Sequence, residues 1–189
     1  MVGLGNPGPE YDGTRHNLGA DAVRVLAARR NLGMRRGRER AAVAETRVDG
    51  ALVALAVPET YMNLSGESVA RLVRRYRVEG DGDRVVVVHD EMDLPVGRVK
   101  VKLGGGVAGH NGLDSIRSHL HTPGFVRVRI GIARPPTSAM AASYVLRRPP
   151  ARERVELEVA VEQAADAVEL ILADGVEAAM NRFNTAPPG

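Results

Sequence analysis

The sequence contains no cysteine and no tryptophan, and only 2 of its 26 basic residues are lysine. Without cysteine, the chain can form neither disulfides nor thiolate metal or redox sites, and a reducing compartment suits it. No apolar run approaches the length that spans a bilayer, and the first residues lack the basic and apolar segments of a signal peptide. We therefore expect a cytoplasmic protein with no part in the membrane.

Length and composition are those of one compact unit. The 189 residues suffice for one buried core but not for two ordinary domains, so residues 1–189 are expected to form a single domain. Hydrophobic residues make up 44% and charged residues 26%, and these values argue against extended disorder.

Charge is distributed unevenly along the chain. Residues 1–150 carry 23 basic and 15 acidic side chains, whereas residues 151–189 carry 3 and 8. A basic body attracts polyanions such as RNA. An arginine-rich composition from a GC-rich coding sequence explains many of the same residues, since charge runs are usually solvated faces. Charge therefore permits an RNA partner without identifying one.

Apolar runs alternate with amphipathic segments along the whole sequence. The four valines at 85–88 have no polar alternation, which is typical of a central strand covered on both faces. The interleaving predicts an α/β fold of the phosphorylase/hydrolase kind, with a twisted mixed, mostly parallel β-sheet flanked by helices. The predicted strands are 2–5, 41–48, 52–57, 85–89, 99–103 and 126–132, and the predicted helices are 15–30, 66–76, 113–120, 152–173 and 177–183.

One glycine motif points to a different function. Residues 3–8 read G-L-G-N-P-G, which satisfies the G-x-G-x-x-G string of dinucleotide-binding proteins. That motif works when a helix opens at its third glycine. Here Pro7 and Pro9 flank Gly8, and helical periodicity starts only near residue 15. A nucleotide-dependent oxidoreductase is therefore a distant alternative.

A histidine, a carboxylate and three asparagines each follow a predicted strand. They are Asn6, His16, Asn63, Asp90 and Asn111. Ligands of open α/β sheets sit beyond the carboxyl ends of the strands, so we expect these side chains to converge at one edge.

Such a set suits ester hydrolysis by activated water. His16 would take the proton from water, Asp90 would fix the imidazole tautomer, and asparagine amides would hold the developing oxyanion. Taken singly, strand-end Asp and Asn are common turn formers, and a histidine near a helix start is often a surface group. A metal site at His89, Asp90 and Asp93 lacks supporting ligand spacing, and no G-x-S-x-G elbow offers a serine nucleophile.

Five longer motifs are more specific than any of these single residues. They are G-L-G-N-P-G-x-x-Y-x-x-T-R-H-N at 3–17, Y-M-N-x-S-G at 61–66, H-D-E-M-D-L-P at 89–95, K-L-G-G-G-x-x-G-H-N-G-L at 102–113 and R-V-R-I-G-I at 127–132. In this order and over this length, the chain resembles the bacterial peptidyl-tRNA hydrolases.

The resemblance implies a monomer that hydrolyses the ester between a peptide and the terminal ribose of tRNA, without metal or cofactor. It makes His16 the catalytic base and Asp90 its partner, and Asn6 joins the catalytic set. Five further residues then bind the peptide and the tRNA acceptor end: Tyr11, Met62, Asn63, His110 and Asn111. Lys102 and Arg129 match the basic pair that clamps the tRNA 5′ phosphate.

Two further features bear on this resemblance. Lys100 and Lys102 alternate on one strand face beside three glycines whose amides can approach phosphate. Residues 137–142 resemble the lid of the family but carry no lysine. The main alternative is a relative of the same fold that binds RNA without catalysis, similar to plant organelle splicing factors. A pure binder has no need of the complete histidine, aspartate and asparagine set.

Overall fold

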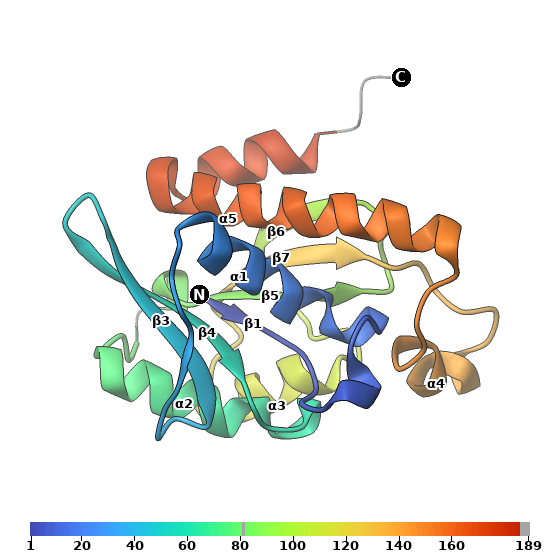
Figure 1. The fold of residues 1–189 in the computed structure, drawn as a ribbon, viewed down its shortest axis with the longest axis horizontal. Coiled ribbons are helices and arrows are strands. Elements are labelled where there is room, and N and C mark those ends of the chain that lie inside the picture. The colour runs from blue at the N-terminus through green and yellow to red at the C-terminus, as the bar shows by residue number, and fades with distance from the viewer. Residues whose placement is uncertain (81, 186–189) are drawn as a thin grey trace.

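The computed structural model describes residues 1–80 and 82–185 (Figure 1). These residues form one seven-stranded sheet in the order β2-β3-β4-β1-β5-β7-β6. The strands are β1 (Val2–Gly3), β2 (Arg35–Arg36), β3 (Ala41–Val48), β4 (Ala51–Pro58), β5 (Val86–Glu91), β6 (Val99–Leu103) and β7 (Val126–Gly131). The central strands β4, β1, β5 and β7 are parallel, and antiparallel pairing adds β3 and β2 on one side and β6 on the other. The expected mixed, mostly parallel sheet is confirmed.

Helices cover both faces of this sheet. Helices α1 (Leu18–Arg29) and α5 (Ala151–Asn184) lie on one face, and α2 (Ser65–Tyr76) and α3 (Asn111–Leu120) lie on the other (Figure 1). The remaining elements are the short helix α4 (Ala141–Val145) and the 3-10 turns η1 (Pro9–Tyr11), η2 (Arg15–Asn17), η3 (Met62–Leu64), η4 (Gly82–Arg84) and η5 (Ser138–Met140). No helix within the described ranges has both the length and the apolar character needed to cross a bilayer.

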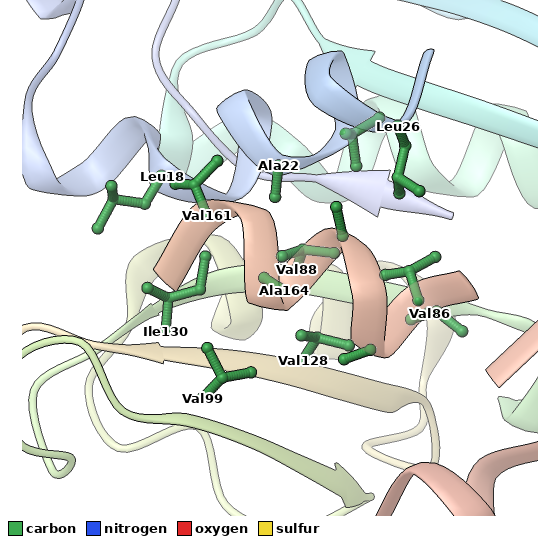
Figure 2. Close-up of a cluster of buried hydrophobic side chains, with 14 of the residues drawn as sticks. Leu18, Ala22, Leu26, Val86, Val88, Val99, Val128, Ile130, Val161 and Ala164 are labelled. Atoms are coloured by element: carbon green, nitrogen blue, oxygen red, sulfur yellow. The ribbon is translucent and has the colours of Figure 1, made fainter. Parts of the chain in front are cut away.

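Strand β5 is buried on both faces, as its unbroken valine run predicts. Val86 and Val88 pack in the cluster beneath α1 and α5, whereas Val87 belongs to the cluster on the side of α2 and α3. Figure 2 shows the first cluster, in which side chains of α1 and α5 meet those of β5, β6 and β7. Packing from both sides therefore holds the central strand and determines where its carboxyl end lies.

The start of α1 lies directly on β1 and β5 because two glycines allow this approach. A Cβ on Gly19 would lie 2.1 Å from the carbonyl oxygen of Val88, and a Cβ on Gly3 would lie 2.2 Å from the carbonyl oxygen of Gly19. Any side chain at either position would push the helix away from the sheet. The close contact brings the turn η2, which precedes α1, to the carboxyl end of β5.

Helix α5 has a break at Gly175, as the sequence predicts. Gly175 has φ 88° and ψ 173°, and the segment after it turns back across the first part of the helix (Figure 1). At the end of this segment, Asn184 Nδ2 donates to the carbonyl oxygen of Val101 at 2.8 Å, and Asn184 Oδ1 accepts the N–H of Val101 at 2.9 Å. Because β6 is the outermost strand on its side, this one side chain occupies part of the sheet edge.

Some element ends differ from the predictions. Strand β5 continues through Glu91, so Asp90 and Glu91 belong to the strand instead of following it. The helix predicted from residue 15 begins at Leu18, after the single turn η2. No α-helix opens at Gly8, as its flanking prolines predict: the short 3-10 turn η1 follows it, and the first α-helix begins at Leu18. The sequence predicts neither β2 nor α4, since both are too short to show a hydrophobic period.

Candidate active site

A hydrogen bond between His16 and Asp90 forms the centre of the candidate site. His16 Nδ1 and Asp90 Oδ1 are 2.8 Å apart, and only 9% and 2% of the two side chains are exposed. His16 comes from η2 and Asp90 from the end of β5, and the two are 74 residues apart in the sequence. When Nδ1–H is donated to the carboxylate, Nε2 carries the lone pair of the neutral ring. The arrangement thus leaves His16 Nε2 available as a base.

A second imidazole shares the same carboxylate oxygen. His110 Nε2 lies 3.1 Å from Asp90 Oδ1, and His110 Nδ1 accepts the backbone N–H groups of Gly112 and Leu113. Because those N–H groups make Nδ1 an acceptor, the proton of the neutral His110 ring is on Nε2 and is donated to Asp90. His110 therefore caps the start of α3 and orients Asp90 at the same time.

Burial and charge act in opposite directions on the pKa values of the pair. Burial lowers the pKa of His16, but the charge of Asp90 and its hydrogen bond outweigh burial, so the pKa lies above the ordinary 6.5. Burial raises the pKa of Asp90, whereas His16 and His110 lower it to well below its usual range. Asp90 is therefore ionised at neutral pH and stabilises the protonated form of His16.

The same three side chains have the donor types of a metal site. Ligand atoms of His16, Asp90 and His110 all lie within 4.8 Å of one another. Binding a metal at His110 Nε2 would move the ring proton to Nδ1, at which two backbone N–H groups already point. The cluster therefore fits a hydrogen-bonded chain of imidazole, carboxylate and imidazole better than it fits a metal centre.

His89 is a packed histidine. It is buried, and its Nδ1 donates to the backbone carbonyl of Asp90 at 2.7 Å. Burial, together with the neighbouring His110, lowers the pKa of His89 to about 3, so the ring stays neutral at physiological pH. Successive strand residues point to opposite faces, so His89 and Asp90 diverge. This placement does not support the alternative metal set of His89, Asp90 and Asp93.

Asn6 is held rigidly by its neighbours. Its backbone N–H donates to Asn17 Oδ1 at 2.8 Å, and Asn17 Nδ2 donates to the Asn6 carbonyl at 3.0 Å. Asn6 Oδ1 accepts the backbone N–H of Met62 at 2.8 Å. The Nδ2 group of Asn6 has no hydrogen-bond partner among the described residues. Asn6 thus offers an oriented N–H donor to an incoming oxygen.

Three other residues predicted to bind the substrate lie in η3 and at the start of α3. Met62 is buried, and its sulfur lies 2.5 Å from the position that a Cβ on Gly112 would take, so it packs against the start of α3. Asn63 in η3 and Asn111 at the start of α3 are exposed, and neither side chain forms a hydrogen bond with the described residues. Their amides are therefore open to a ligand.

A cavity of about 270 Å³ opens beside His16 and Asp90. Its lining also includes His110, Asn111, four residues of the lid-like segment 137–142, and Val145 at the end of α4. Two larger cavities, of about 440 and 560 Å³, include neither His16 nor Asp90. We therefore take the smaller cavity as the candidate active site because His16 and Asp90 line it, although it is not the largest. The smaller cavity is not lined by Asn6, Tyr11, Met62 or Asn63, and Asn6 lines the cavity of about 440 Å³ instead. The ring of Tyr11, which is half-buried, meets Tyr61 edge to face, with ring centroids 6.4 Å apart.

The predicted phosphate-binding pair lies on the face of β6 and β7. Lys100 is paired with Arg129 and Lys102 with Arg127, which puts all four side chains on the same face of the sheet. Lys102 and Arg129 are therefore diagonal neighbours. Lys102 is exposed, while Arg129 Nε donates to Glu91 Oε2 at 3.0 Å. We call these two lysines and two arginines the basic face.

Several residues that support the site are missed by the sequence analysis. Buried Arg127 donates to the carbonyl oxygens of Gly105 and Gly106 at 2.6 and 2.5 Å and so holds the glycine loop. Asn17 holds Asn6, and Arg15 donates to Glu153 at the start of α5. For all three, the only sequence signal is a position inside the longer motifs, at 3–17 and 127–132.

The chain matches known proteins over its whole length. The family model described as Peptidyl-tRNA hydrolase matches residues 1–188. A Frankia casuarinae protein named peptidyl-tRNA hydrolase is 50% identical over 184 residues, which cover 97% of this chain and 92% of that protein. A Cutibacterium acnes protein of the same name is 48% identical over 197 aligned positions, covering 98% and 97%. The crystal structure of peptidyl-tRNA hydrolase from Acinetobacter baumannii superposes with a TM-score of 0.92 at 36% identity, covering 100% of this chain and 95% of that one.

Proposed function

The chain belongs to the peptidyl-tRNA hydrolase family, and we propose that it hydrolyses the ester bond of peptidyl-tRNA with His16 as general base. The observation that carries this proposal is the buried hydrogen bond between His16 and Asp90 at the wall of a cavity. Relatives of about 50% identity are named for that hydrolase activity. A purely RNA-binding relative is not favoured, because such a protein has no need to keep this pair.

The reaction begins with proton transfer from water to His16. Asp90 keeps the ring proton on Nδ1, so Nε2 accepts a proton from the water that attacks the ester carbonyl carbon. The imidazolium that forms is stabilised by the charge of Asp90. The same proton then passes to the ribose oxygen as the carbon–oxygen bond breaks, which yields the free peptide carboxyl group and a tRNA hydroxyl.

The asparagines and the groove residues hold the two parts of the substrate. Asn6 Nδ2 donates to the oxygen that becomes negative in the transition state, since its other amide atom is already bonded. Exposed Asn63 and Asn111 bind the peptide and the terminal ribose. Outside the cavity, Tyr11 and Met62 form part of the wall that receives the rest of the substrate, and His110 keeps Asp90 in place.

The basic face receives the tRNA. Lys102 forms no ion pair among the described residues. Arg129 uses Nε to bind Glu91, and its two terminal nitrogens form no hydrogen bond with the described residues. This pair binds the 5′ phosphate beside the acceptor end. Since translation supplies the substrate, the proposed place of action is the cytoplasm, where the chain works as a monomer without a cofactor or a stable protein partner.

Release of tRNA from N-acetylated aminoacyl-tRNA tests this function. We expect the purified chain to hydrolyse this substrate and His16→Ala to lower turnover by roughly 10² to 10⁴ while uncharged tRNA still binds. His121→Asn is the matched control, because His121 is exposed and already has the positive φ of 55° that asparagine tolerates. Absence of release by the wild type would end the proposal. Full turnover in His16→Ala would remove His16 as the base.

A further inference from the structure

Arg15, the residue before His16, forms a buried ion pair with the start of α5. Its Nε and Nη2 donate to the two carboxylate oxygens of Glu153 at 2.6 and 2.8 Å. Only 6% of the Arg15 side chain and 18% of the Glu153 side chain are exposed. Two parallel bonds between planar groups fix orientation as well as distance. Turn η2 is therefore tied to α5 in one geometry.

The same guanidinium also holds the end of α4. Arg15 Nη1 donates to the carbonyl oxygens of Arg147 and Tyr144 at 3.1 and 3.4 Å, and the Arg15 backbone N–H donates to the Arg147 carbonyl at 3.4 Å. Its Cζ atom lies 4.1 Å from the centroid of the Tyr144 ring. Tyr144 is itself anchored, since its hydroxyl donates to the carbonyl of Ile132 at 2.6 Å. One side chain thus connects η2, α4 and α5.

The segments that Arg15 connects line the same cavity. His16 contributes one part of the wall, and Ala141, Ala142 and Val145 of α4 contribute another. The spacing between the base and the α4 wall therefore depends on the bonds of Arg15. A base activates water well only when the reacting carbon is held within a narrow range of distances, and small misplacements lower the rate strongly.

We propose that Arg15 is a positioning residue of the reaction: with Glu153, it sets the spacing between His16 and the α4 wall of the substrate cavity. It acts through η2 and α4 without touching the substrate. The inference rests on the proposed function, since it concerns the same cavity. A buried ion pair is weak evidence for stability but gives one defined geometry, and this geometry joins two walls of one site.

Conservative variants separate this role from a purely structural one. Arg15→Lys keeps the charge but loses the planar fork, and Glu153→Gln keeps the shape but loses the charge. For each we expect kcat to fall by about 10- to 100-fold, with KM and the binding of uncharged tRNA little changed. The control is Arg29→Lys, because Arg29 pairs with Glu162 and Asp166 on the outer side of α1 and α5, away from the cavity. It should leave kcat unchanged.

The absence of cysteine provides a second measurement that does not depend on activity. Ala141→Cys places a single thiol on the α4 wall, and its rate of alkylation by iodoacetamide reports how firmly the wall is held. We expect a severalfold faster reaction when Arg15→Lys or Glu153→Gln is added, and no change with Arg29→Lys.

The outcomes distinguish the inference from the function on which it rests. A wild type that releases no tRNA overturns the proposed hydrolase, while the thiol measurement still decides whether Arg15 holds the wall. The positioning role is wrong if the wild type is active and both variants have the same kcat as the wild type, measured at a temperature at which all three proteins are folded. A fall in melting temperature with kcat and alkylation unchanged likewise leaves Arg15 as a stabilising residue only.

Discussion

The two regions that meet the proposed substrate are built in opposite ways. Around His16 and Asp90, the side chains are buried and hydrogen-bonded in one arrangement. On the basic face, Arg127 and Arg129 are bonded to the glycine loop and to Glu91, but Lys102 is exposed and forms no ion pair among the described residues. Buried dipoles and charges stabilise a developing charge strongly because they are already oriented. Exposed charges attract at longer range and are screened by salt.

This difference assigns a different task to each region. We call His16, Asp90 and His110 the buried corner. It suits bond breaking, which requires atoms at fixed distances, whereas the basic face suits capture of a polyanion whose phosphates approach from solvent. Substitutions should therefore fail in two ways: turnover should fall in the corner, and affinity should fall on the basic face.

Asp90→Asn is expected to have the largest effect in the corner. The amide can donate to His16 Nδ1, which moves the ring proton to Nε2 and removes the base, so turnover should fall by roughly 10² to 10⁴. In the wild type, kcat/KM should rise with pH through a pKa above 6.5, because the base must be deprotonated and Asp90 raises its pKa. Without that charge, burial alone acts, so the remaining activity should rise at lower pH. An unchanged pH profile would contradict this account.

The matched control for that profile is Asp93→Asn. Asp93 is three residues along the same segment but pairs with exposed Arg134 at 2.5 Å instead of a histidine. Its replacement should leave both turnover and the pH profile close to those of the wild type. A similar loss of turnover in both variants would mean that the negative charge of the segment, not the pairing of Asp90 with His16, controls the rate.

Gly19→Ala should damage the corner from a distance. A Cβ there would lie 2.1 Å from the carbonyl oxygen of Val88, so α1 and η2 must move away from β5. We expect a loss of about 1–3 kcal/mol in the free energy of unfolding, measured in urea, and a fall in turnover as His16 leaves Asp90. Gly33→Ala is the control, because a Cβ at Gly33 meets nothing within 4 Å. Full activity in Gly19→Ala would show that the corner tolerates looser packing.

Lys102→Ala should have the smallest effect, and on affinity instead of turnover. Loss of one phosphate contact should weaken binding of 5′-phosphorylated substrate and reduce the slope of log affinity against log salt by about 1. At saturating substrate, kcat should stay close to that of the wild type. Arg152→Ala is the control, since Arg152 is almost fully exposed at the start of α5. An identical salt slope in Lys102→Ala would remove Lys102 from the phosphate site.

Regular packing made much of the fold predictable. The bounds predicted for β3 and β6 agree with the structure, and the break at Gly175 falls between the helices predicted at 152–173 and 177–183. The end of β5 was not predictable, because Asp90 and Glu91 are polar and suggest a loop, although pairing with β7 continues through both. Thr14 precedes η2 without capping it, because its hydroxyl donates to the carbonyl of Tyr11 at 2.7 Å.

The site was predictable only where strand ends determine it. The pairing of His16 with Asp90 followed from the rule that ligand-binding groups lie beyond the carboxyl ends of strands. The second bond to Asp90, from His110, depends on a tautomer set by N–H groups at the start of α3, which no local pattern reveals. Arg15 and Glu153 are 138 residues apart, and only the folded chain shows that they meet.

The contact of Asn184 with Val101 has a consequence for self-association. The outer edge of a strand carries unpaired N–H and carbonyl groups, which can recruit a strand from another molecule and begin aggregation. The side-chain amide of Asn184 engages both groups of Val101, as a neighbouring backbone would. Lys100 and Lys102 lie on either side of that position and add like charges that repel a second copy. At Val101 the outer edge of β6 is thus closed to a second strand, while Lys102 beside it stays exposed.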